Sequence, residues 1–247
     1  MKAYAKTDIG SKRSMNQDYM YCNTEPVGSF QNLLIVADGM GGHRAGDYAS
    51  RLCVETMVQS LEKSAHKTPV SLFEEAVTAA NKAVFEESAS HVEYEGMGTT
   101  VVLAVAEGNR VVIAHAGDSR AYLIHGTDLR QLTHDHTVVQ MLIEQGEITR
   151  EEALSHPQRH YITRAVGVEQ EIDVEFAEVE LEEDDAVLLC SDGLYNYADP
   201  AAFPELVRKA LAEGDAGCLI DAANAAGGGD NITAVILSGS MKEKVHG

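Results

Sequence analysis

Four aspartates stand at the ends of apolar runs, where their carboxylates could meet and bind a cation. Asp38, Asp118 and Asp192 each follow such a run directly or one residue later, and Asp230 stands two residues before one. If these ends converge, carboxylates within about 4–6 Å of one another repel and raise each other's pKa. A divalent cation removes that repulsion, and a set of oxygen ligands selects a hard ion such as Mg²⁺ or Mn²⁺ over zinc or copper.

The same dipeptides have a simpler interpretation, because Asp-Gly and Gly-Asp are common turn sequences after strands. Any one of them is therefore more often a turn than a ligand. The longer motifs around each aspartate favour the metal site, since a turn alone would not require them.

The composition indicates a globular and strongly acidic protein. Of its 247 residues 45% are hydrophobic, and 19 Lys and Arg against 39 Asp and Glu leave a net charge of −20. This charge repels phosphate backbones and anionic bilayers, so we expect neither a nucleic-acid nor a membrane partner. No stretch approaches the roughly 18 apolar residues of a membrane span, and we expect a cytoplasmic location. The four scattered cysteines form no Cys-x-x-Cys pair, which argues against a thiolate zinc site.

Seven apolar runs bounded by turn residues predict β-strands. They span Asn32–Ala37, Thr99–Ala106, Arg110–Ala116, Arg120–Ile124, Asp173–Glu180, Asp185–Cys190 and Thr233–Leu237. Several are apolar throughout, which indicates that both faces of the strand are covered. The links 107–109, 117–119 and 125–127 are too short for a crossover helix, so we expect the strands that they join to pair antiparallel.

Apolar stripes with helical spacing alternate with these strands. The stripes predict helices over about 45–62, over 72–84 after a Thr68-Pro69 start, over 203–211 and over 219–226. Antiparallel strands covered on both faces, with helix pairs early and late in the chain, predict an α+β fold. We expect a four-layer αββα sandwich of two antiparallel β-sheets flanked by helix pairs. No linker divides the chain, so residues 1–247 are expected to form a single domain.

Eight short motifs occur in a characteristic order: Asp8–Gly10, Arg13–Asp18, Ala37–His43, Gly98–Thr100, Gly117–Arg120, Leu132–His136, Ser191–Leu194 and Asp230–Thr233. Together they resemble the metal-dependent serine/threonine protein phosphatases, the PPM or protein phosphatase type 2C family, in its short bacterial form. The resemblance covers nearly the whole chain. It implies the same αββα sandwich and an enzyme that hydrolyses phosphoserine and phosphothreonine in proteins.

The resemblance implies a centre of two or three Mn²⁺ or Mg²⁺ ions. Asp38 would bridge two of them, and Asp192 and Asp230 would complete the first. The backbone carbonyl of Gly39 would bind the second ion. Asp118, together with Asp192, would bind a third ion seen in bacterial members.

The same resemblance implies direct attack on phosphorus by a hydroxide that bridges two cations. Asp18 would hold metal-bound water, and Arg13 would bind two phosphate oxygens through its guanidinium fork. Eukaryotic relatives have a histidine directly after the Asp-Gly pair, but here that position is Met40, whose thioether cannot donate a proton. His43 is therefore a candidate general acid, and metal-bound water is the competing donor.

Residues 133–167 interrupt the strand pattern and resemble the flap that lies beside the catalytic cleft in bacterial members. Short helical stretches are expected over Val138–Gln145 and Arg150–Leu154. The segment holds four of the ten histidines, namely His134, His136, His156 and His160. Their spacing follows no usual zinc pattern, which favours substrate contact and hydrogen-bonded loop structure.

The resemblance also implies phosphoprotein substrates, a cognate serine/threonine kinase and a monomer. The charge of −20 favours basic phosphopeptides over acidic ones. Three alternatives stay open: a regulator of the same fold that is specific for one dedicated phosphoprotein, a non-catalytic phosphopeptide-binding module, and a metal-dependent phosphodiesterase or nuclease. The intact aspartates argue against the second, and the net charge argues against the third.

Overall fold

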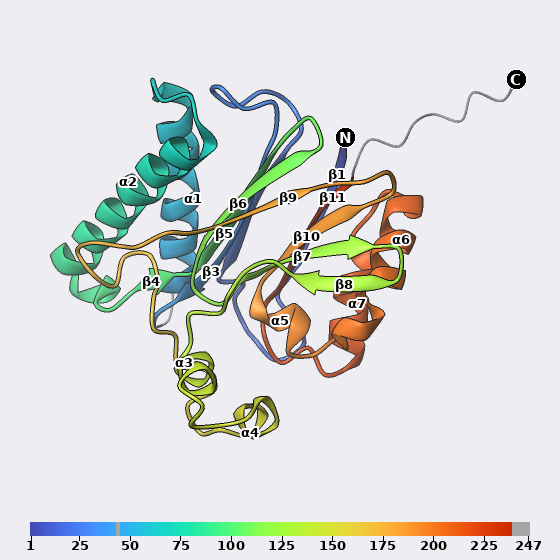
Figure 1. Cartoon of the computed structure of the whole chain (residues 1–247). Helices are drawn as coiled ribbons and strands as arrows, with labels where there is room; N and C mark the ends of the chain where they lie inside the picture. The colour runs from blue at the N-terminus through green and yellow to red at the C-terminus, as the bar shows by residue number, and fades with distance from the viewer. Residues whose placement is uncertain (43–44, 239–247) are drawn as a thin grey trace, which may run out of the picture.

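Two antiparallel β-sheets lie face to face in the computed structural model, which describes residues 1–42 and 45–238 (Figure 1). In spatial order the first sheet contains β1 (Lys2–Asp8), β11 (Ile232–Ser238), β10 (Ala186–Cys190), β7 (Arg120–His125) and β8 (Asp128–Gln131). The second contains β2 (Asp18–Asn23), β3 (Leu33–Met40), β5 (Val101–Glu107), β6 (Arg110–Ala116) and β9 (Glu175–Glu180), with the short β4 (Gly98–Thr99) paired to β3.

Helix pairs cover the outer face of each sheet (Figure 1). Helices α1 (Ala45–Lys63) and α2 (Pro69–Ser90) pack on the second sheet, and α6 (Phe203–Glu213) and α7 (Gly217–Ala225) pack on the first. Shorter elements are η1 (Val92–Tyr94), α5 (Asp192–Tyr195) and η2 (Pro200–Ala202). The expected N-cap Thr68 accepts a hydrogen bond from the Ser71 N–H, with Pro69 in the first turn. The predicted four-layer αββα sandwich is confirmed.

Three apolar cores separate the four layers, and β3 shows why. Leu33, Ile35 and Ala37 point into the core beneath α1 and α2, whereas Leu34 and Val36 point into the core between the sheets. A strand alternates its side chains between two faces, so burial on both faces requires a continuous apolar run. A third core lies between the first sheet and helices α6 and α7.

One predicted pairing is wrong. The link 107–109 joins the antiparallel neighbours β5 and β6, and 125–127 lies between β7 and β8, which also pair antiparallel. The link 117–119, however, carries the chain from β6 in one sheet to β7 in the other. Packed sheets lie about 10 Å apart, a gap that three extended residues can span. Gly117 begins this crossing with φ +113°, in the region that favours glycine.

Strands β1, β2 and β8 are not predicted by apolar runs. Strand β1 contributes only the small side chains of Ala3 and Ala5 to the core between the sheets. Strand β2 alternates partly buried tyrosines with Met20 and Cys22, so it contains no aliphatic run. Its register nevertheless matters for the site, because Asp18 lies directly opposite Asp38 of β3.

The segment expected to form a flap carries α3 (Val138–Glu144) and α4 (Arg150–Leu154) and projects from one end of the sandwich (Figure 1). Its two ends meet in a bridge between Thr137 and Ile162. Thr149 and Glu152 form a capping box that fixes the start of α4. Within residues 1–42 and 45–238, none of the helices has the length and hydrophobicity needed to cross a membrane.

Replacement of Gly39 by alanine should destabilise the fold. A Cβ added there would lie 2.0 Å from the Gly46 carbonyl oxygen, so the start of α1 would have to move away from β3. We expect Gly39→Ala to lower the free energy of unfolding by about 2–3 kcal/mol in urea titrations with chelator present. Gly42→Ala is the control, because a Cβ there meets nothing within 4 Å. Equal losses in both variants would contradict the steric argument.

Candidate metal centre and cleft

Asp18 and Asp38 form the centre of the site, on paired positions of β2 and β3. The Asp18 Oδ2 atom accepts hydrogen bonds from Ser191 Oγ at 2.7 Å and Thr233 Oγ1 at 2.6 Å. Its Oδ1 atom is buried and accepts no hydrogen bond from any residue in the described part of the chain. A buried carboxylate oxygen without a donor is costly, and a cation or an ordered water would satisfy it.

The backbone of Asp38 is fixed by the threonines of the Gly98–Thr100 motif. Thr100 Oγ1 lies 3.1 Å from the Asp38 N–H and accepts its hydrogen bond. Thr99 Oγ1 and the Thr100 N–H both donate to the Asp38 carbonyl oxygen, each at 2.9 Å. These contacts hold the end of β3 against β4, so the backbone that carries the Asp38 carboxylate is fixed.

Four other aspartates surround Asp38 and act on its carboxylate. Burial raises the pKa of Asp38 well above its usual range, and repulsion from Asp18, Asp192, Asp118 and Asp230 raises it further. Burial also raises the pKa of Asp18 to about 6. Four carboxylates around a fifth form an arrangement that is unfavourable without protons or a cation.

Asp118 and Asp192 approach this cluster from the ends of β6 and β10. Burial, followed by repulsion from Asp192 and Asp135, raises the pKa of Asp118 to about 7. Burial and repulsion from Asp230 and Asp18 raise the pKa of Asp192 to about 7 as well. The Tyr195 hydroxyl donates to the Asp118 carbonyl oxygen at 3.0 Å, which ties α5 to the crossing between the sheets.

Arg13 and Asp230 lie together at the rim of the site. Arg13 Nη2 donates to Asp230 Oδ2 at 2.6 Å, and the two side chains are 49% and 28% exposed. The neighbouring Asn231 positions the segment that carries Arg13, because its amide donates to the Ile9 and Met15 carbonyl oxygens and its Oδ1 accepts from the Gln17 N–H. The structure thus brings Arg13 from a distant part of the chain to the aspartates.

Gly39 lies at the end of β3, and the Gln17 carbonyl oxygen accepts its N–H at 3.0 Å. A Cβ added at Gly46 would lie 2.7 Å from the Gly39 carbonyl oxygen. Gln17 Nε2 would lie 2.4 Å from the same Cβ, so the glycine at position 46 allows both groups to lie close to the start of α1. His43, the candidate general acid, lies outside the described residues.

These observations fit a hard divalent cation. The donors are carboxylates and one backbone carbonyl, the set that Mg²⁺ and Mn²⁺ prefer. The orphaned Oδ1 of Asp18 and the raised pKa values mark places where a cation would be stabilising. The residue types and their arrangement therefore suit the metal centre that the sequence predicts.

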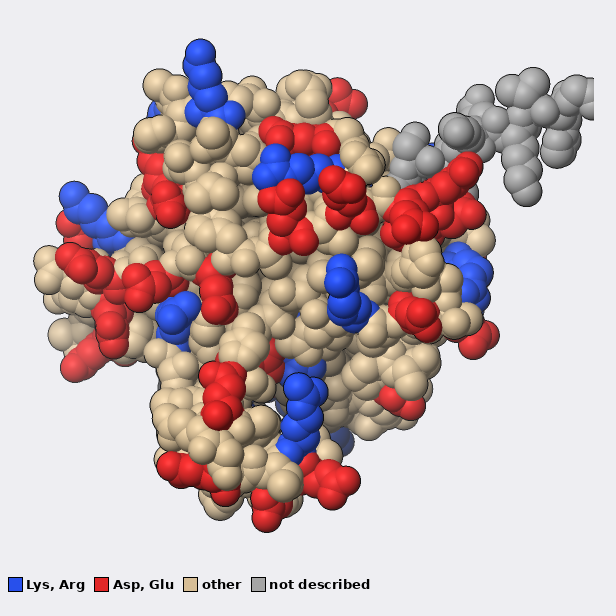
Figure 2. Space-filling view, in the orientation of Figure 1, with Lys and Arg blue, Asp and Glu red and all other residues tan. Residues whose placement is uncertain are grey.

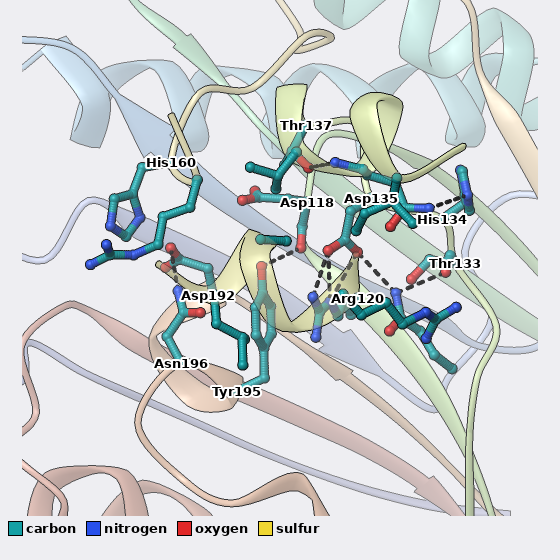
Figure 3. A pocket seen from close by; sticks show the side chains of 18 of the residues that line it. Asp118, Arg120, Thr133, His134, Asp135, Thr137, His160, Asp192, Tyr195 and Asn196 are labelled. Atoms are coloured by element: carbon teal, nitrogen blue, oxygen red, sulfur yellow. Dashed lines mark hydrogen bonds and ion pairs between the residues drawn. The ribbon is translucent and has the colours of Figure 1, made fainter. Parts of the chain in front are cut away.

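A cleft of about 1160 Å³ opens from the aspartates toward the flap (Figure 3). Asp118, Asp192 and Asp230 line one part of it, and residues of α3, α4 and the following loop line another. Between them Arg120 binds Asp135 through several hydrogen bonds and stacks on the Tyr195 ring, 3.5 Å from its centroid (Figure 3). This pair fixes the floor of the cleft next to Asp118.

The flap histidines divide into two groups. His134 and His160 line the cleft (Figure 3), and His134 Nε2 also pairs with Glu144 at 2.6 Å. His156 accepts a hydrogen bond from the Gln158 N–H within the flap loop. His136 is buried at the base of the flap. The first two can contact a substrate, and the other two support the loop.

The buried cluster around His136 is a hydrogen-bonded support. The Gly117 N–H donates to His136 Nδ1 at 3.0 Å, which leaves the proton of the neutral ring on Nε2, 2.9 Å from Glu175. His115 stacks on this ring, and burial lowers the pKa of both histidines. Ligand atoms of His115, His136 and Glu175 lie within 4.8 Å of one another. A zinc ion is nevertheless disfavoured, because Arg164 Nη1 lies 2.9 Å from His136 Nε2.

Several residues within the sequence motifs support the aspartates, although the motifs alone predict no role for them. Ser191 and Thr233 bind Asp18, Thr99 and Thr100 hold Asp38, and Asn231 orders the segment before β2. Ser191 and Asn231 are adjacent to the candidate ligands Asp192 and Asp230, and that proximity was the available signal for these two residues. The threonines are adjacent to no candidate ligand, and the partner of each of the five side chains lies far away in the sequence.

Comparison with known proteins agrees with this geometry. Residues 10–216 match the family described as protein phosphatase 2C. A serine/threonine phosphatase stp from Listeria innocua is 37% identical over 255 aligned positions, which cover 99% of this chain and 98% of that protein.

Solved structures are similar as well. The serine/threonine phosphatase of S. agalactiae superposes with a TM-score of 0.89 at 33% identity, covering 97% of this chain and 99% of that one. The catalytic domain of the phosphatase PstP, solved in complex with 2 manganese ions, gives a TM-score of 0.83 at 34% identity and covers 97% of this chain and 98% of that one. With most of its length matched by the family and by these relatives, the chain belongs to the protein phosphatase 2C family.

Proposed function

We propose that this protein is a metal-dependent serine/threonine protein phosphatase that hydrolyses phosphoserine and phosphothreonine in protein substrates. The observation that carries the proposal is the convergence of four carboxylates on Asp38 at the head of an open cleft, in a chain of the protein phosphatase 2C family. The two sheets, their helices and the flap would act as one phosphatase domain. The substrates would be products of a cognate serine/threonine kinase.

Asp38 would bridge two Mn²⁺ or Mg²⁺ ions, with Asp192 and Asp230 completing the first and the Gly39 carbonyl binding the second. Asp118 and Asp192 would hold a third ion. Cations bound there would polarise the phosphoryl group and lower the pKa of the attacking water. The Asp18 carboxylate would orient water in the site, since Ser191 and Thr233 fix its Oδ2 atom and leave Oδ1 without a donor.

Arg13 would bind and orient the phosphate group. Its guanidinium is half exposed at the rim and lies beside Asp230, so it is placed to form a fork with two phosphate oxygens. The aspartates lie deeper than Arg13, so the reacting phosphate would lie between them and the mouth of the cleft. The open side of the cleft leaves room for the rest of the phosphorylated protein.

Arg13→Ala should mainly weaken substrate binding. A phosphate contact made in both the ground state and the transition state affects KM more than kcat, and we expect KM for a phosphothreonine peptide to rise about tenfold. Arg51→Ala is the matched control, because Arg51 also pairs with an aspartate but lies on α1. A fall in kcat at unchanged KM would contradict the binding role of Arg13.

The proposed function is tested by phosphate release from an aryl phosphate and from a phosphothreonine peptide, with Mn²⁺ and then with excess chelator. We expect hydrolysis of both substrates and its loss on chelation. Activity on a single phosphoprotein alone would indicate a dedicated regulator. Binding of the peptide without phosphate release would indicate a non-catalytic module and would contradict the proposal.

A further inference from the structure

Two arginines in the flap differ from most other arginines of this acidic protein. Arg150 begins α4 and Arg159 lies in the loop after it, and both are exposed and line the cleft. Neither side chain forms an ion pair or a hydrogen bond with any residue described by the structure. By contrast, Arg13, Arg51, Arg110 and Arg120 each bind a carboxylate. The chain has a net charge of −20, so two unpaired guanidinium groups that face one cleft are unusual. They are placed to bind an anionic ligand.

The carboxylates that line the same cleft are already engaged. They are Asp118, Asp135, Asp192 and Asp230. Asp135 is bound by Arg120 and Asp230 by Arg13. Asp118 and Asp192 are assigned to the cations. Once the centre is loaded, the cleft therefore offers no free carboxylate to balance Arg150 and Arg159.

None of the flap glutamates forms an ion pair with Arg150 or Arg159 in the part of the chain that the structure describes. Glu144 pairs with His134, and Glu152 closes the capping box at Thr149. The flap glutamates are absent from the residues that line the cleft. Figure 2 shows acidic side chains spread over this face of the molecule, with blue side chains at the hollow beside the flap. Four aspartates and three arginines line the cleft, so bound cations would make its local charge opposite to that of the whole protein.

The cleft is also larger than one phosphorylated side chain requires. Its volume of about 1160 Å³ exceeds the roughly 300–1,000 Å³ of pockets that enclose a small molecule. Residues on either side of the phosphorylated residue would therefore pass along the flap. Arginine is suited to bind their carboxylates, because its planar fork matches two oxygens at once.

We propose that Arg150 and Arg159 bind acidic side chains next to the phosphorylated residue, and that the enzyme therefore prefers phosphopeptides with acidic flanks. The inference rests on the proposed phosphatase function and names its substrate class. It reverses the preference for basic peptides that the net charge alone favours. An exposed ion pair is worth little by itself, so we expect about a two- to fivefold effect from each arginine.

The test compares three phosphothreonine peptides that differ only in glutamate, alanine or lysine flanks. It uses wild type, the double variant R150Q/R159Q and the control R130Q, all with Mn²⁺. Arg130 is exposed and does not line the cleft, so R130Q removes the same charge elsewhere. We expect wild type and R130Q to favour the glutamate peptide over the alanine peptide about five- to tenfold in kcat/KM. In the double variant, the kcat/KM values for the glutamate and alanine peptides should differ by no more than about twofold.

Further readouts separate this role from others. The preference for glutamate flanks should appear as a lower KM with kcat unchanged. It should weaken as the salt concentration is raised from low ionic strength. Equal loss on all peptides and on an aryl phosphate would place the arginines at the phosphate itself and overturn the proposal. An unchanged ranking in the double variant, or a wild-type preference for lysine flanks, would overturn it too. Failure of wild type to hydrolyse any phosphopeptide would overturn the proposed function as well.

Discussion

Asp38→Asn should lower kcat by at least about a thousandfold in the presence of Mn²⁺ while leaving the fold intact. Four other carboxylates lie around Asp38 and repel it. Its carboxylate is therefore at the centre of the cluster, where it could bind two cations at once. Asparagine keeps the size of the side chain but removes its charge, and the amide is a much weaker ligand for a hard cation. Loss of the bridge would remove the charge stabilisation that accelerates phosphoryl transfer.

The same substitution should stabilise the metal-free protein. Removing one negative charge from the buried cluster relieves repulsion, so the free energy of unfolding at pH 8 with chelator should rise by about 1 kcal/mol or more. Asp221→Asn, on an exposed position of α7, is the matched control for both measurements. Activity close to that of wild type in Asp38→Asn would rule out the proposed bridge. Lower stability without metal would contradict the repulsion argument.

Removal of the metal should make stability fall as the pH rises from about 4 to about 7. Burial and repulsion raise the pKa of Asp118 and Asp192 from 3.8 to about 7. The folded state therefore binds more protons than the unfolded state in this range, so the free energy of unfolding decreases with increasing pH. The favourable contribution is complete below the unfolded pKa near 3.8 and is lost once the pH passes the folded values. His115 and His136 act in the opposite direction, because burial lowers their pKa values.

The comparison of wild type with Asp192→Asn isolates the carboxylate effect from that of the histidines. In urea titrations with chelator, the two proteins should be similar near pH 4, and the variant should be more stable by about 3 kcal/mol at pH 8. Saturating Mn²⁺ should reverse the order, since a ligand that binds only the folded state stabilises wild type more. A difference that does not depend on pH would contradict the electrostatic account. An unchanged order with Mn²⁺ would count against Asp192 as a ligand.

Much of the fold could be predicted because burial on two faces has a simple signature. The continuous apolar runs of β3, β5, β6 and β10 predict strands with both faces covered, and the helical stripes predict the outer layers. Strands β1 and β2 were not predicted, because they lie at the sheet edges and have small or aromatic side chains in place of aliphatic runs. The pairing of β6 with β7 was wrong because a three-residue link can also cross between facing sheets.

Apolar runs and turn residues are local features, so the amino-acid order alone establishes which acidic residues stand at strand ends. The folded chain was needed to learn that Asp18 lies opposite Asp38, that Ser191 and Thr233 hold its Oδ2 atom, and that Oδ1 has no donor among the described residues. The same applies to the charge of the cleft. Net charge is a sum over the whole chain, whereas Arg150 and Arg159 face a particular cavity in which the aspartates are already engaged. Register and packing join residues that are distant in the chain, and no local pattern records those contacts.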